Sequence, residues 1–555
     1  MTRVVNSRIR LLLLCILLVF AALFARAGWL ATVRASALSK MAQVQTKIPV
    51  VLPAGRGTIF DATGTPLALG EQAATVYVDP TEVRRPRREA AIAARVLDLK
   101  PGRVFASLTR SGTHFSYVER KAPLQAAGLL ARRRLPGFHF YAEERRTYPQ
   151  HSVAAQVLGY AGVDNNGLSG LELELDKQLS GRPGKQVVVR DPFGRAIKID
   201  SVTPARPGRS VFLTLDHTIQ ANAEQVLRQT VAKIGAKSAT AIVLDPKTGA
   251  VLAMASAPGY DANAFPTASA RFQRTHAVSD FFEPGSVFKV VTIAGALSEH
   301  KVTPETKFTL PYSIQVADRV IHDAELRGTE TMTVAQILQR SSNVGTVTIA
   351  RTLLGESQLK KWIKQFGFGE KTGIDFPGET PGLLPSYWSG STIGNVPIGQ
   401  GISVTAIQLA SVYAAIANGG LWVQPHLLDH VQGDRPPPPR TRRILSRSVD
   451  RTLLGILKGV VSDLGTAAEA EIPGYTVAGK TGTAQKPGPH GYEPGKYVAT
   501  FVGTVPASNP RLVVLVTVDE PRTVIFGGLV AAPAFAQIAA FDLQYLEVPP
   551  DRPLR

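Results

Sequence analysis

A long apolar stretch at the N-terminus is the first feature of the chain. Residues Ile9 to Ala25 are apolar except for one arginine, and a second apolar stretch, Ala27 to Val33, follows directly after Arg26. Because long arginine side chains can extend to the membrane surface, the combined stretch reaches the roughly 20 residues that cross a bilayer. We therefore expect a transmembrane anchor over residues 9–33, preceded by a cytoplasmic tail of residues 1–8.

A cleaved signal peptide is the alternative interpretation of this stretch. Ala25-Arg26-Ala27 loosely resembles a small-x-small cleavage site, although the central arginine and the bulky Trp29 disfavour cleavage. The arginines before the stretch favour a cytoplasmic N-terminus, and those after it weaken that rule. No later stretch reaches spanning length without charges. We expect a single-pass protein of the cytoplasmic (inner) membrane whose body lies in the periplasm or extracytoplasmic space.

Apolar runs of strand and helix length are mixed in the second half of the chain. The patterns predict strands at 211–215, 477–484, 498–505 and 512–518, a hairpin over 241–256, and helices at 218–233, 287–300, 405–418 and 530–546. The late strands follow one another as a meander. This order favours an antiparallel sheet covered by helices and hence an α+β fold.

Changes in composition and in the pattern of apolar runs also divide the chain into domains. Residues 34–205 are rich in Arg, Gly and Pro, with short β-like runs, and from about Ser210 the mixed pattern begins. We expect an extended N-terminal domain at 34–205, a second domain at 206–546, and a C-terminal tail at 547–555. A chain of 555 residues is long enough for both domains.

Charge and cysteine content narrow the function classes. The net charge of +19 suggests an anionic neighbourhood, but an exported body meets no nucleic acid, so we expect no nucleic-acid partner. The single Cys15 lies inside the apolar stretch. An intrachain disulfide, a cysteine nucleophile and a cysteine-based zinc site are therefore excluded.

Two copies of Ser-x-x-Lys occur, and their surroundings differ. Serine needs a base beside it to become a nucleophile, and residues three apart share a helix face. Ser286 and Lys289 begin an apolar helix, where burial can lower the lysine pKa. Ser357 and Lys360 lie in a charged helix that predicts a solvated face. We therefore take Ser286 as the nucleophile and Lys289 as its base.

Three copies of Lys-Thr-Gly and one Ser-x-Asn complete the candidate set. The copies at Lys247 and Lys371 fall in a hairpin turn and a loop, whereas Lys480-Thr481-Gly482, followed by Thr483, falls on a predicted strand. Of the nine asparagines, only Asn343 has a serine, Ser341, two residues before it. By itself that pair is most often a helix C-cap.

The ordered set Ser286, Ser341, Lys480 resembles the S-x-x-K, S-x-N, K-T-G set of penicillin-binding proteins and class A β-lactamases. Further segments resemble class B penicillin-binding proteins, namely Arg56–Ala68, Arg146–Pro149, Gln156–Gly159, Gly167–Glu172, Phe282–Ser286, Gln400–Gly401 and Gly527–Gly528. The resemblance covers residues from about 55 to 540. The chain departs from the family pattern at three places outside the catalytic set. Asp61-Ala62-Thr63-Gly64 replaces the usual Asp-Arg-x-Gly, Ile525-Phe526 stands where tyrosines are common, and His276 stands where another polar residue is common.

The resemblance implies an N-terminal transmembrane helix, a non-catalytic pedestal domain and a penicillin-binding transpeptidase domain. It implies that Ser286 forms an acyl-enzyme with a peptidoglycan stem peptide, that Lys289 is the base, that Ser341 and Lys480 relay a proton, and that Asn343 holds the acyl chain. Lys480, Thr481 and Thr483 would bind the substrate carboxylate around Gly482. No metal or cofactor is implied.

The family also implies partners. These are stem peptides and their lipid-linked precursor, β-lactams as inhibitors, a SEDS-family membrane glycosyltransferase and divisome proteins. The compact length resembles a division-type enzyme acting in septal wall synthesis. The alternatives are an elongation-type transpeptidase, a β-lactamase or penicillin sensor, and a non-catalytic scaffold that activates a glycosyltransferase. No Glu-x-x-Leu-Asn segment between Ser341 and Lys480 supports the β-lactamase.

Overall fold

The computed structural model describes residues 2–36, 47–190, 196–434, 438–489 and 491–553. These residues form two compact units, one of residues 1–55 and 181–208, the other of residues 56–180 and 209–555. Residues 1, 554 and 555 of the two predicted tails lie outside the described part. Each unit has its own architecture.

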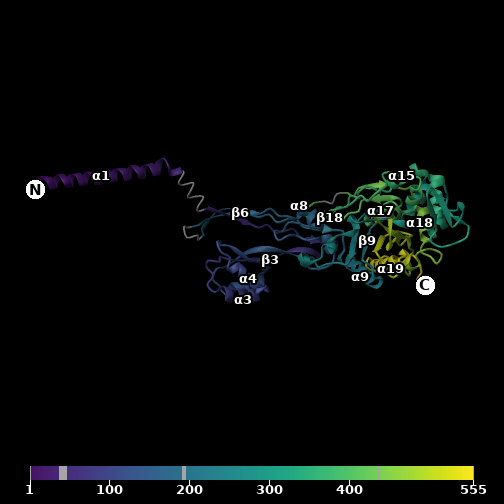
Figure 1. Ribbon diagram of the computed structural model, residues 1–555, viewed down its shortest axis with the longest axis horizontal. Helices are drawn as coiled ribbons and strands as arrows, with labels where there is room; N and C mark the ends of the chain where they lie inside the picture. Colours follow the sequence, from purple (N-terminus) through teal and green to yellow (C-terminus); the bar gives the residue numbers. More distant parts are fainter. Residues whose placement is uncertain (1, 37–46, 191–195, 435–437, 490, 554–555) are drawn as a thin grey trace. The chain divides into compact units, whose positions relative to one another are not determined.

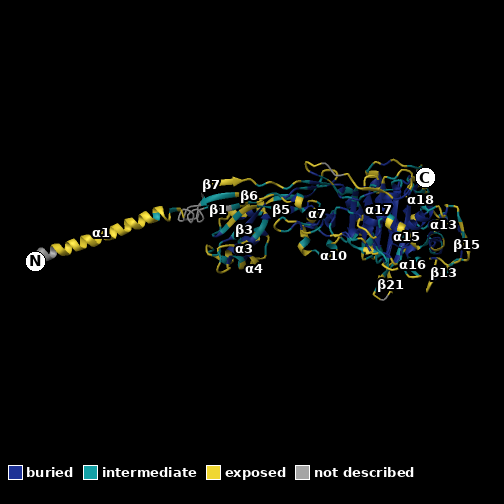
Figure 2. Cartoon of the chain, turned by 90° about the horizontal axis from the view of Figure 1, so that it is seen from above, coloured by how far each residue is buried: buried dark blue, intermediate teal, exposed yellow. Residues whose placement is uncertain are grey.

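The first unit contains the predicted anchor and a small sheet. The described side chains of helix α1 (Thr2–Thr32) are almost all exposed, as Figure 2 shows, and Asn6–Thr32 is long and apolar enough to cross a membrane. Strands β1 (Lys47–Leu52), β6 (Gly184–Arg190) and β7 (Ala196–Thr203) pair antiparallel in the order β1-β6-β7. An apolar helix without a protein core around it is what a single-pass membrane anchor requires.

The second unit begins with a sheet that has helices on one face. Strand β3 (Pro66–Val78) pairs with β2 (Ile59–Phe60), β4 (Ser116–Pro123) and β5 (Phe138–Thr147). Helices α3 (Pro86–Leu97), α4 (Pro101–Leu108) and α5 (Leu124–Arg132) bury a separate apolar core against β3 and β4. Strands β8 (Val211–Leu213) and β18 (Leu428–Val431) extend the sheet beyond β2.

A buried ionic cluster links residues from distant parts of this region. The Glu172 carboxylate is fully buried and accepts hydrogen bonds at 2.6 Å from both Arg56 Nε and Arg146 Nε. Arg56 also binds Asp176 at 2.7 Å. Two arginines compensate one buried carboxylate, which makes the burial of its charge tolerable.

A five-stranded antiparallel sheet forms the centre of the second unit. Its order is β10-β9-β22-β21-β20, from β10 (Val251–Ala257) through β9 (Ser238–Leu244), β22 (Leu512–Asp519) and β21 (Gly491–Val505) to β20 (Ala478–Gly488). Helices α9 (His217–Ile234) and α19 (Gly527–Tyr545) pack together on one face, and α17 (Ala406–Ala417) packs on the other (Figure 1). The edge strand β20 carries the predicted Lys-Thr-Gly motif.

Helical segments lie beside this edge. They are η2 (Gly285–Phe288), α12 (Lys289–Ser298), α13 (Val334–Gln339), α14 (Asn343–Ile349), α15 (Gly355–Gln365) and α18 (Arg447–Lys458). Two short antiparallel pairs precede α13, namely β12 (Lys307–Leu310) with β15 (Glu330–Thr333) and β13 (Ser313–Val316) with β14 (Arg319–His322). Helix α12 is buried on almost all sides, which its nearly continuous apolar sequence explains.

Shorter elements complete the chain. They are α6 (Ala155–Leu158), α7 (Gly170–Glu174), α8 (Asp176–Leu179), η1 (Ala262–Thr267), α10 (Ala270–Gln273), α11 (His276–Ser279), β11 (Phe281–Phe282), η3 (Ala350–Leu354), α16 (Thr392–Asn395), η4 (Val396–Ile398), β16 (Val404–Thr405), β17 (Leu421–Val423), β19 (Thr441–Arg443) and η5 (Ala468–Ala470). The α+β fold with an antiparallel sheet flanked by helices is confirmed. The predicted 287–300 helix differs slightly, since it starts as the 3₁₀ turn η2.

Candidate active site

Ser286 lies on η2, in a segment that several contacts hold in place. The Glu283 carboxylate accepts hydrogen bonds at 2.8 Å from Gly401 N and from the Tyr492 hydroxyl. Gly285 has φ 57 and donates from its N–H to Gly399 O at 3.0 Å. Positive φ is the conformation that glycine adopts without strain. The turn therefore presents the Ser286 side chain, which is half-buried, at the start of α12.

Lys289, one turn after Ser286, is fully buried. Its Nζ donates to Ser341 O at 2.5 Å, to Asn343 Oδ1 at 2.7 Å and to Ser341 Oγ at 3.2 Å. Burial is the main cause that holds the pKa of Lys289 well below its usual range, the positive charge of Lys480 adds to it, and Asp323 opposes it. A lowered pKa favours the uncharged amine, which is the form of lysine that can act as a general base.

Ser341 and Asn343 lie where α13 ends and α14 begins. Ser341 has φ 61, a left-handed conformation that costs a non-glycine residue about 1–3 kcal/mol and is found at functional sites. Ser342 caps α14, because its hydroxyl accepts a hydrogen bond from Gly345 N at 2.9 Å. The cap fixes Asn343 as the first residue of the helix, with its side chain beside Lys289.

Lys480 reaches the same place from β20. Its Nζ lies 3.0 Å from Ser341 Oγ and 3.2 Å from Thr481 O. The side chain is fully buried, and burial lowers the pKa of Lys480 to about 7. The Thr481 hydroxyl lies 2.7 Å from that of Thr466, and the Thr483 hydroxyl accepts from Gly527 N at 3.1 Å. An anion bound here would favour the charged form of Lys480.

Gly482 lets β20 approach the nucleophile segment closely. A Cβ at this position would lie 2.8 Å from Pro284 O and 3.1 Å from Val287 Cγ1. These two residues flank Gly285 and Ser286 in sequence. Without a side chain, the strand that carries Thr483 packs directly against η2.

The structure thus brings Lys289, Ser341, Asn343 and Lys480 into one hydrogen-bonded network, with Thr481, Gly482 and Thr483 on the strand beside it. Ser286 lies on the adjoining turn, and its hydroxyl makes no hydrogen bond to any residue that the structure describes. Catalytic hydrogen bonds of free enzymes often shorten only when substrate is bound.

The other motif copies lie elsewhere, as predicted. Ser357 is exposed on α15, and Lys360 pairs there with Glu356 at 2.5 Å. Lys247 belongs to the turn between β9 and β10, where its N–H donates to Asp245 Oδ1 at 2.8 Å. Thr372, beside Lys371, is buried in a loop and donates from its N–H and hydroxyl to the Glu379 carboxylate.

Some residues of this region were not predicted from the sequence. Asp323 and Arg327 follow β14, and Asp323 contacts Ser342 at 3.0 Å. Glu283 was noticed only as part of a family motif, and no pattern linked it to Tyr492. Contacts between residues this far apart carry no periodic signal in sequence, so only a structure could find them.

A group of potential metal ligands, Asp61, Asp216 and His217, lies apart from the catalytic network. Asp61 Oδ2 lies 2.6 Å from His217 Nδ1, and Asp216 Oδ1 accepts from Thr218 N at 2.8 Å at the start of α9. These contacts give each side chain a structural role. We assign no metal to the group.

Comparison with known proteins identifies two family domains. The chain matches the model of the penicillin-binding protein transpeptidase domain over residues 239–540. It matches the penicillin-binding protein dimerisation domain over residues 51–213.

Curated relatives are similar over almost the whole chain. The peptidoglycan D,D-transpeptidase FtsI of Escherichia coli (strain K12) is 33% identical over 561 residues, covering 99% of this chain and 93% of the relative. The probable peptidoglycan D,D-transpeptidase PenA of Neisseria gonorrhoeae is 32% identical and covers 99% of this chain and 94% of its own length.

A solved structure shows the same fold. Penicillin-binding protein 3 of Mycobacterium tuberculosis, in complex with aztreonam, has a TM-score of 0.72 and 32% identity, and the match covers 91% of this chain and 99% of that one. The chain therefore belongs to the penicillin-binding proteins and is a peptidoglycan D,D-transpeptidase similar to FtsI.

Proposed function

We propose that Ser286 is the nucleophile of this transpeptidase. Its Oγ attacks the carbonyl carbon of the penultimate D-Ala of a stem pentapeptide, and the bond to the terminal D-Ala breaks. The N–H groups of Ser286 and Thr483 stabilise the oxyanion. An amine of a second stem peptide then displaces Ser286 Oγ and completes the cross-link. The one observation that carries this proposal is the convergence of Lys289 and Lys480 on Ser341 Oγ, at 3.2 and 3.0 Å.

Lys289 takes the Ser286 proton in this mechanism. Burial lowers its pKa and so favours the uncharged amine, which lies one helical turn from the serine and can accept its proton. Ser341 then passes a proton towards the leaving amine of D-Ala. Its hydroxyl accepts from Lys480 Nζ, so its own hydrogen can be donated to a third partner.

Substrate binding falls to β20 and to Asn343. Lys480, Thr481 and Thr483 bind the terminal carboxylate of the stem peptide, and the approach of this anion recharges Lys480. Asn343 holds the acyl chain. β-Lactams, which present a comparable carboxylate and carbonyl, acylate the same serine.

The membrane anchor, the domain bounds and the partner proteins complete the proposal. Helix α1 holds the chain in the inner membrane with its N-terminus in the cytoplasm and its catalytic domain in the periplasm or extracytoplasmic space, where stem peptides and their lipid-linked precursor lie. We place the anchor at residues 9–33, the pedestal at 34–205 and the transpeptidase domain at 206–546. The family matches at 51–213 and 239–540 support this division. A SEDS-family glycosyltransferase supplies the glycan, and divisome proteins direct the enzyme to the septum.

Labelling with a fluorescent penicillin tests the nucleophile. The full-length protein in detergent is expected to form a stable fluorescent band on a denaturing gel, and Ser286→Ala is expected to form none. Release of D-Ala from a synthetic stem pentapeptide with a diamino acid acceptor checks the transfer itself. An unlabelled wild-type protein would contradict the enzymatic proposal, and rapid loss of the label would favour a hydrolase.

A fluorescent fusion tests the cellular role. The division-type enzyme is expected to gather at the septum of dividing cells. An even distribution along the lateral wall would instead favour an elongation-type enzyme, and septal localisation with no cross-linking activity would favour the scaffold.

A further inference from the structure

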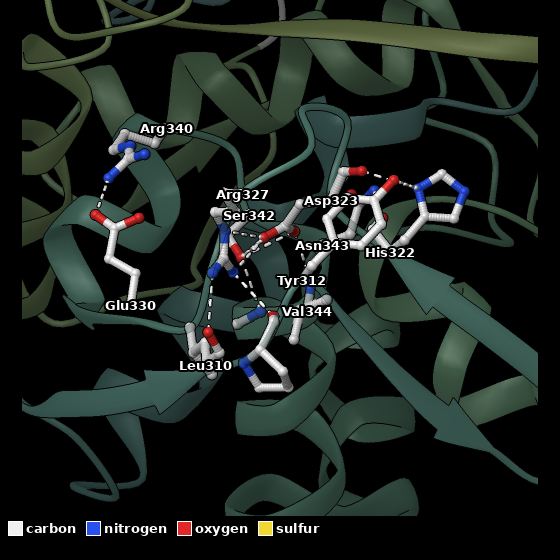
Figure 3. Close-up of polar contacts among 12 residues, drawn as sticks. Leu310, Tyr312, His322, Asp323, Arg327, Glu330, Arg340, Ser342, Asn343 and Val344 are labelled. Atoms are coloured by element: carbon white, nitrogen blue, oxygen red, sulfur yellow. Dashed lines mark hydrogen bonds and ion pairs between the residues drawn. The ribbon is translucent and has the colours of Figure 1, made fainter.

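The loop that follows β14 contacts the segment of Ser342, Asn343 and Val344, as Figure 3 shows. Asp323, the first residue of this loop, is buried. Its Oδ1 accepts hydrogen bonds at 3.0 Å from the Ser342 hydroxyl and from Val344 N. Ser342 stands between the site residues Ser341 and Asn343, so Asp323 binds the backbone segment that carries both.

Arg327 holds the Asp323 carboxylate in place. Its Nε and Nη2 donate to Asp323 Oδ2 at 3.0 and 2.6 Å, and its Nη1 donates to Leu310 O at 2.8 Å. Both side chains are about nine-tenths buried, at 12% and 8% exposure. Because two guanidinium nitrogens converge on one carboxylate oxygen, the contact holds the position of the carboxylate as well as its charge.

The residue before Asp323 orients the amide of Asn343. Asn343 Nδ2 donates to His322 O at 2.9 Å, and its Oδ1 accepts from Lys289 Nζ at 2.7 Å. Because the two ends of the amide differ, the carbonyl at His322 selects the orientation in which the oxygen faces Lys289.

The direction of the Lys289 lone pair follows from these contacts. An uncharged lysine amine has two hydrogens and one lone pair. Ser341 O at 2.5 Å and Asn343 Oδ1 at 2.7 Å are its two nearest acceptors. When these two accept the hydrogens, the lone pair has only one direction left. His322 at the end of β14 and Asp323 after it fix the positions of both acceptors.

On the basis of the proposed function, we propose that Asp323, held by Arg327, is a positioning residue for acylation, which sets the geometry of Ser341 and Asn343 around Lys289 and offsets the charge of the two catalytic lysines. Asp323 touches neither the substrate nor Ser286. It acts through Ser342, through Val344 N and through its charge.

The charges around Lys289 determine the expected pH effect. Among the described residues, Lys480 on β20 lowers the pKa of Lys289, as burial does, and Asp323 raises it. Arg327 faces Asp323, and His322 Nδ1 lies 2.8 Å from Asp323 O. Removal of the Asp323 charge therefore lowers the Lys289 pKa further. Because the uncharged amine is the active form, acylation then persists to lower pH.

The test is the pH profile of the second-order rate constant for acylation by fluorescent penicillin, measured with the full-length protein in detergent. Asp323→Asn keeps an acceptor for Ser342 and Val344 N but removes the charge, and with it the oxygen that accepts from Arg327. We expect the acid limb of the Asp323→Asn profile to lie about one pH unit lower than that of wild type. The rate constant on the plateau is expected to stay within a few-fold of wild type. Asp323→Ala loses both the acceptor and the charge. Its acylation rate constant on the plateau of the pH profile is expected to fall at least about tenfold.

Two control variants distinguish this role of Asp323 from a general effect of changing a charge or a ring near the site. Glu330→Gln removes a charge of the same sign from the half-exposed Glu330–Arg340 pair, which Figure 3 shows apart from Ser342. His322→Gln removes the imidazole that lies against Asp323 O and keeps the backbone carbonyl that binds Asn343. Both controls are expected to keep the wild-type acid limb.

The outcomes separate this inference from the proposed function. If wild type is not labelled, the proposed function fails. If wild type is labelled but Asp323→Asn keeps the wild-type acid limb while its melting temperature drops, the role of Asp323 is structural only and the inference fails. An equal shift in Glu330→Gln also overturns it. Since Asp323→Asn keeps the helix cap, the test stands even if Asp323→Ala does not fold.

Discussion

Lys480 Nζ lies 3.0 Å from the Ser341 hydroxyl, although 139 residues separate the two in sequence. Lys289 Nζ lies 3.2 Å from the same oxygen. The serine hydroxyl can accept from Lys480 and keep its own hydrogen for another partner, while the uncharged Lys289 donates its two hydrogens to Ser341 O and Asn343 Oδ1. The contact joins an edge strand to a helix junction, and several consequences of it can be measured.

Ser341→Ala is expected to slow acylation by fluorescent penicillin by a factor of about 10²–10⁴, the usual contribution of a positioned proton-transfer group. Ser341→Gly lacks the same hydroxyl and is expected to be as slow. Because φ is 61 at this position, the glycine variant should be more stable than the alanine variant by about 1 kcal/mol. Chemical denaturation of the two variants measures this difference, and a more stable alanine variant would contradict the strained backbone.

The buried lysines predict how stability depends on pH. Burial lowers the folded-state pKa of Lys480 to about 7, while an unfolded lysine titrates near 10.4. Between these values the unfolded state binds one more proton, so Lys480 makes the free energy of unfolding rise by about 1.4 kcal/mol per pH unit. This contribution ends above the unfolded pKa and is constant below pH 7.

Lys480→Met should lose that part of the slope. Urea denaturation of both proteins between pH 7.5 and 9.5 measures the slope. The free energy of unfolding of the methionine variant, relative to that of wild type, is expected to be most favourable at pH 7.5. Parallel pH profiles would show that Lys480 keeps its proton throughout this range.

Gly482→Ala tests the close approach of β20 to η2. The added methyl group would meet Pro284 O at 2.8 Å, so strand and turn must separate. We expect a loss of about 1–3 kcal/mol of stability together with much slower acylation. Gly455→Ala is the matched control, because Gly455 lies inside α18 with open space around it and should gain about 0.5–1 kcal/mol. Unchanged acylation in Gly482→Ala would contradict the packing of β20 against η2.

Tyr492→Phe removes the hydroxyl that donates to Glu283 at 2.8 Å. The Glu283 carboxylate is buried, and burial raises its pKa, so the loss of one donor should cost about 1–3 kcal/mol. Tyr387→Phe, at an exposed position, is the control and should change nothing. Thermal unfolding and the penicillin acylation rate measure both effects. Equal melting temperatures of the two variants would argue against a structural role for the Tyr492–Glu283 contact.

Glu172→Ala tests the buried ionic cluster of the N-terminal region. Removal of this carboxylate leaves Arg56 and Arg146 buried without their shared partner, which should cost about 3–5 kcal/mol. Protein that remains folded should be labelled by penicillin at the wild-type rate, because the change does not touch the catalytic network. Glu174→Ala, exposed two residues later, should be neutral in both denaturation and labelling.

Much of the site could be predicted because its residues stand in regular elements. Ser286 and Lys289 are three apart at the start of an apolar helix, and Lys480 lies on a strand whose alternatives, Lys247 and Lys371, fall in a turn and a loop. Charged neighbours correctly indicated that Ser357 is exposed. Apolar periodicity and local turn chemistry were sufficient for these conclusions.

What the sequence did not reveal is contacts between residues far apart in the chain. Asp323 binds Ser342, which is 19 residues away, and Glu283 binds Tyr492, which is 209 residues away. Neither pair has a spacing that a helix or a strand imposes. The left-handed φ of Ser341 was also not predicted, because serine has no general preference for it.

Peptide mapping by mass spectrometry after treatment with penicillin tests the central claim most directly. Lys360 ends the tryptic peptide that contains Ser357, and Lys289 ends the one that contains Ser286, so the two serines are separated. The account predicts one penicilloyl group per chain, on the peptide of Ser286, and none in Ser286→Ala. A penicilloyl group on any other residue, or an acylated Ser286→Ala protein, would contradict it.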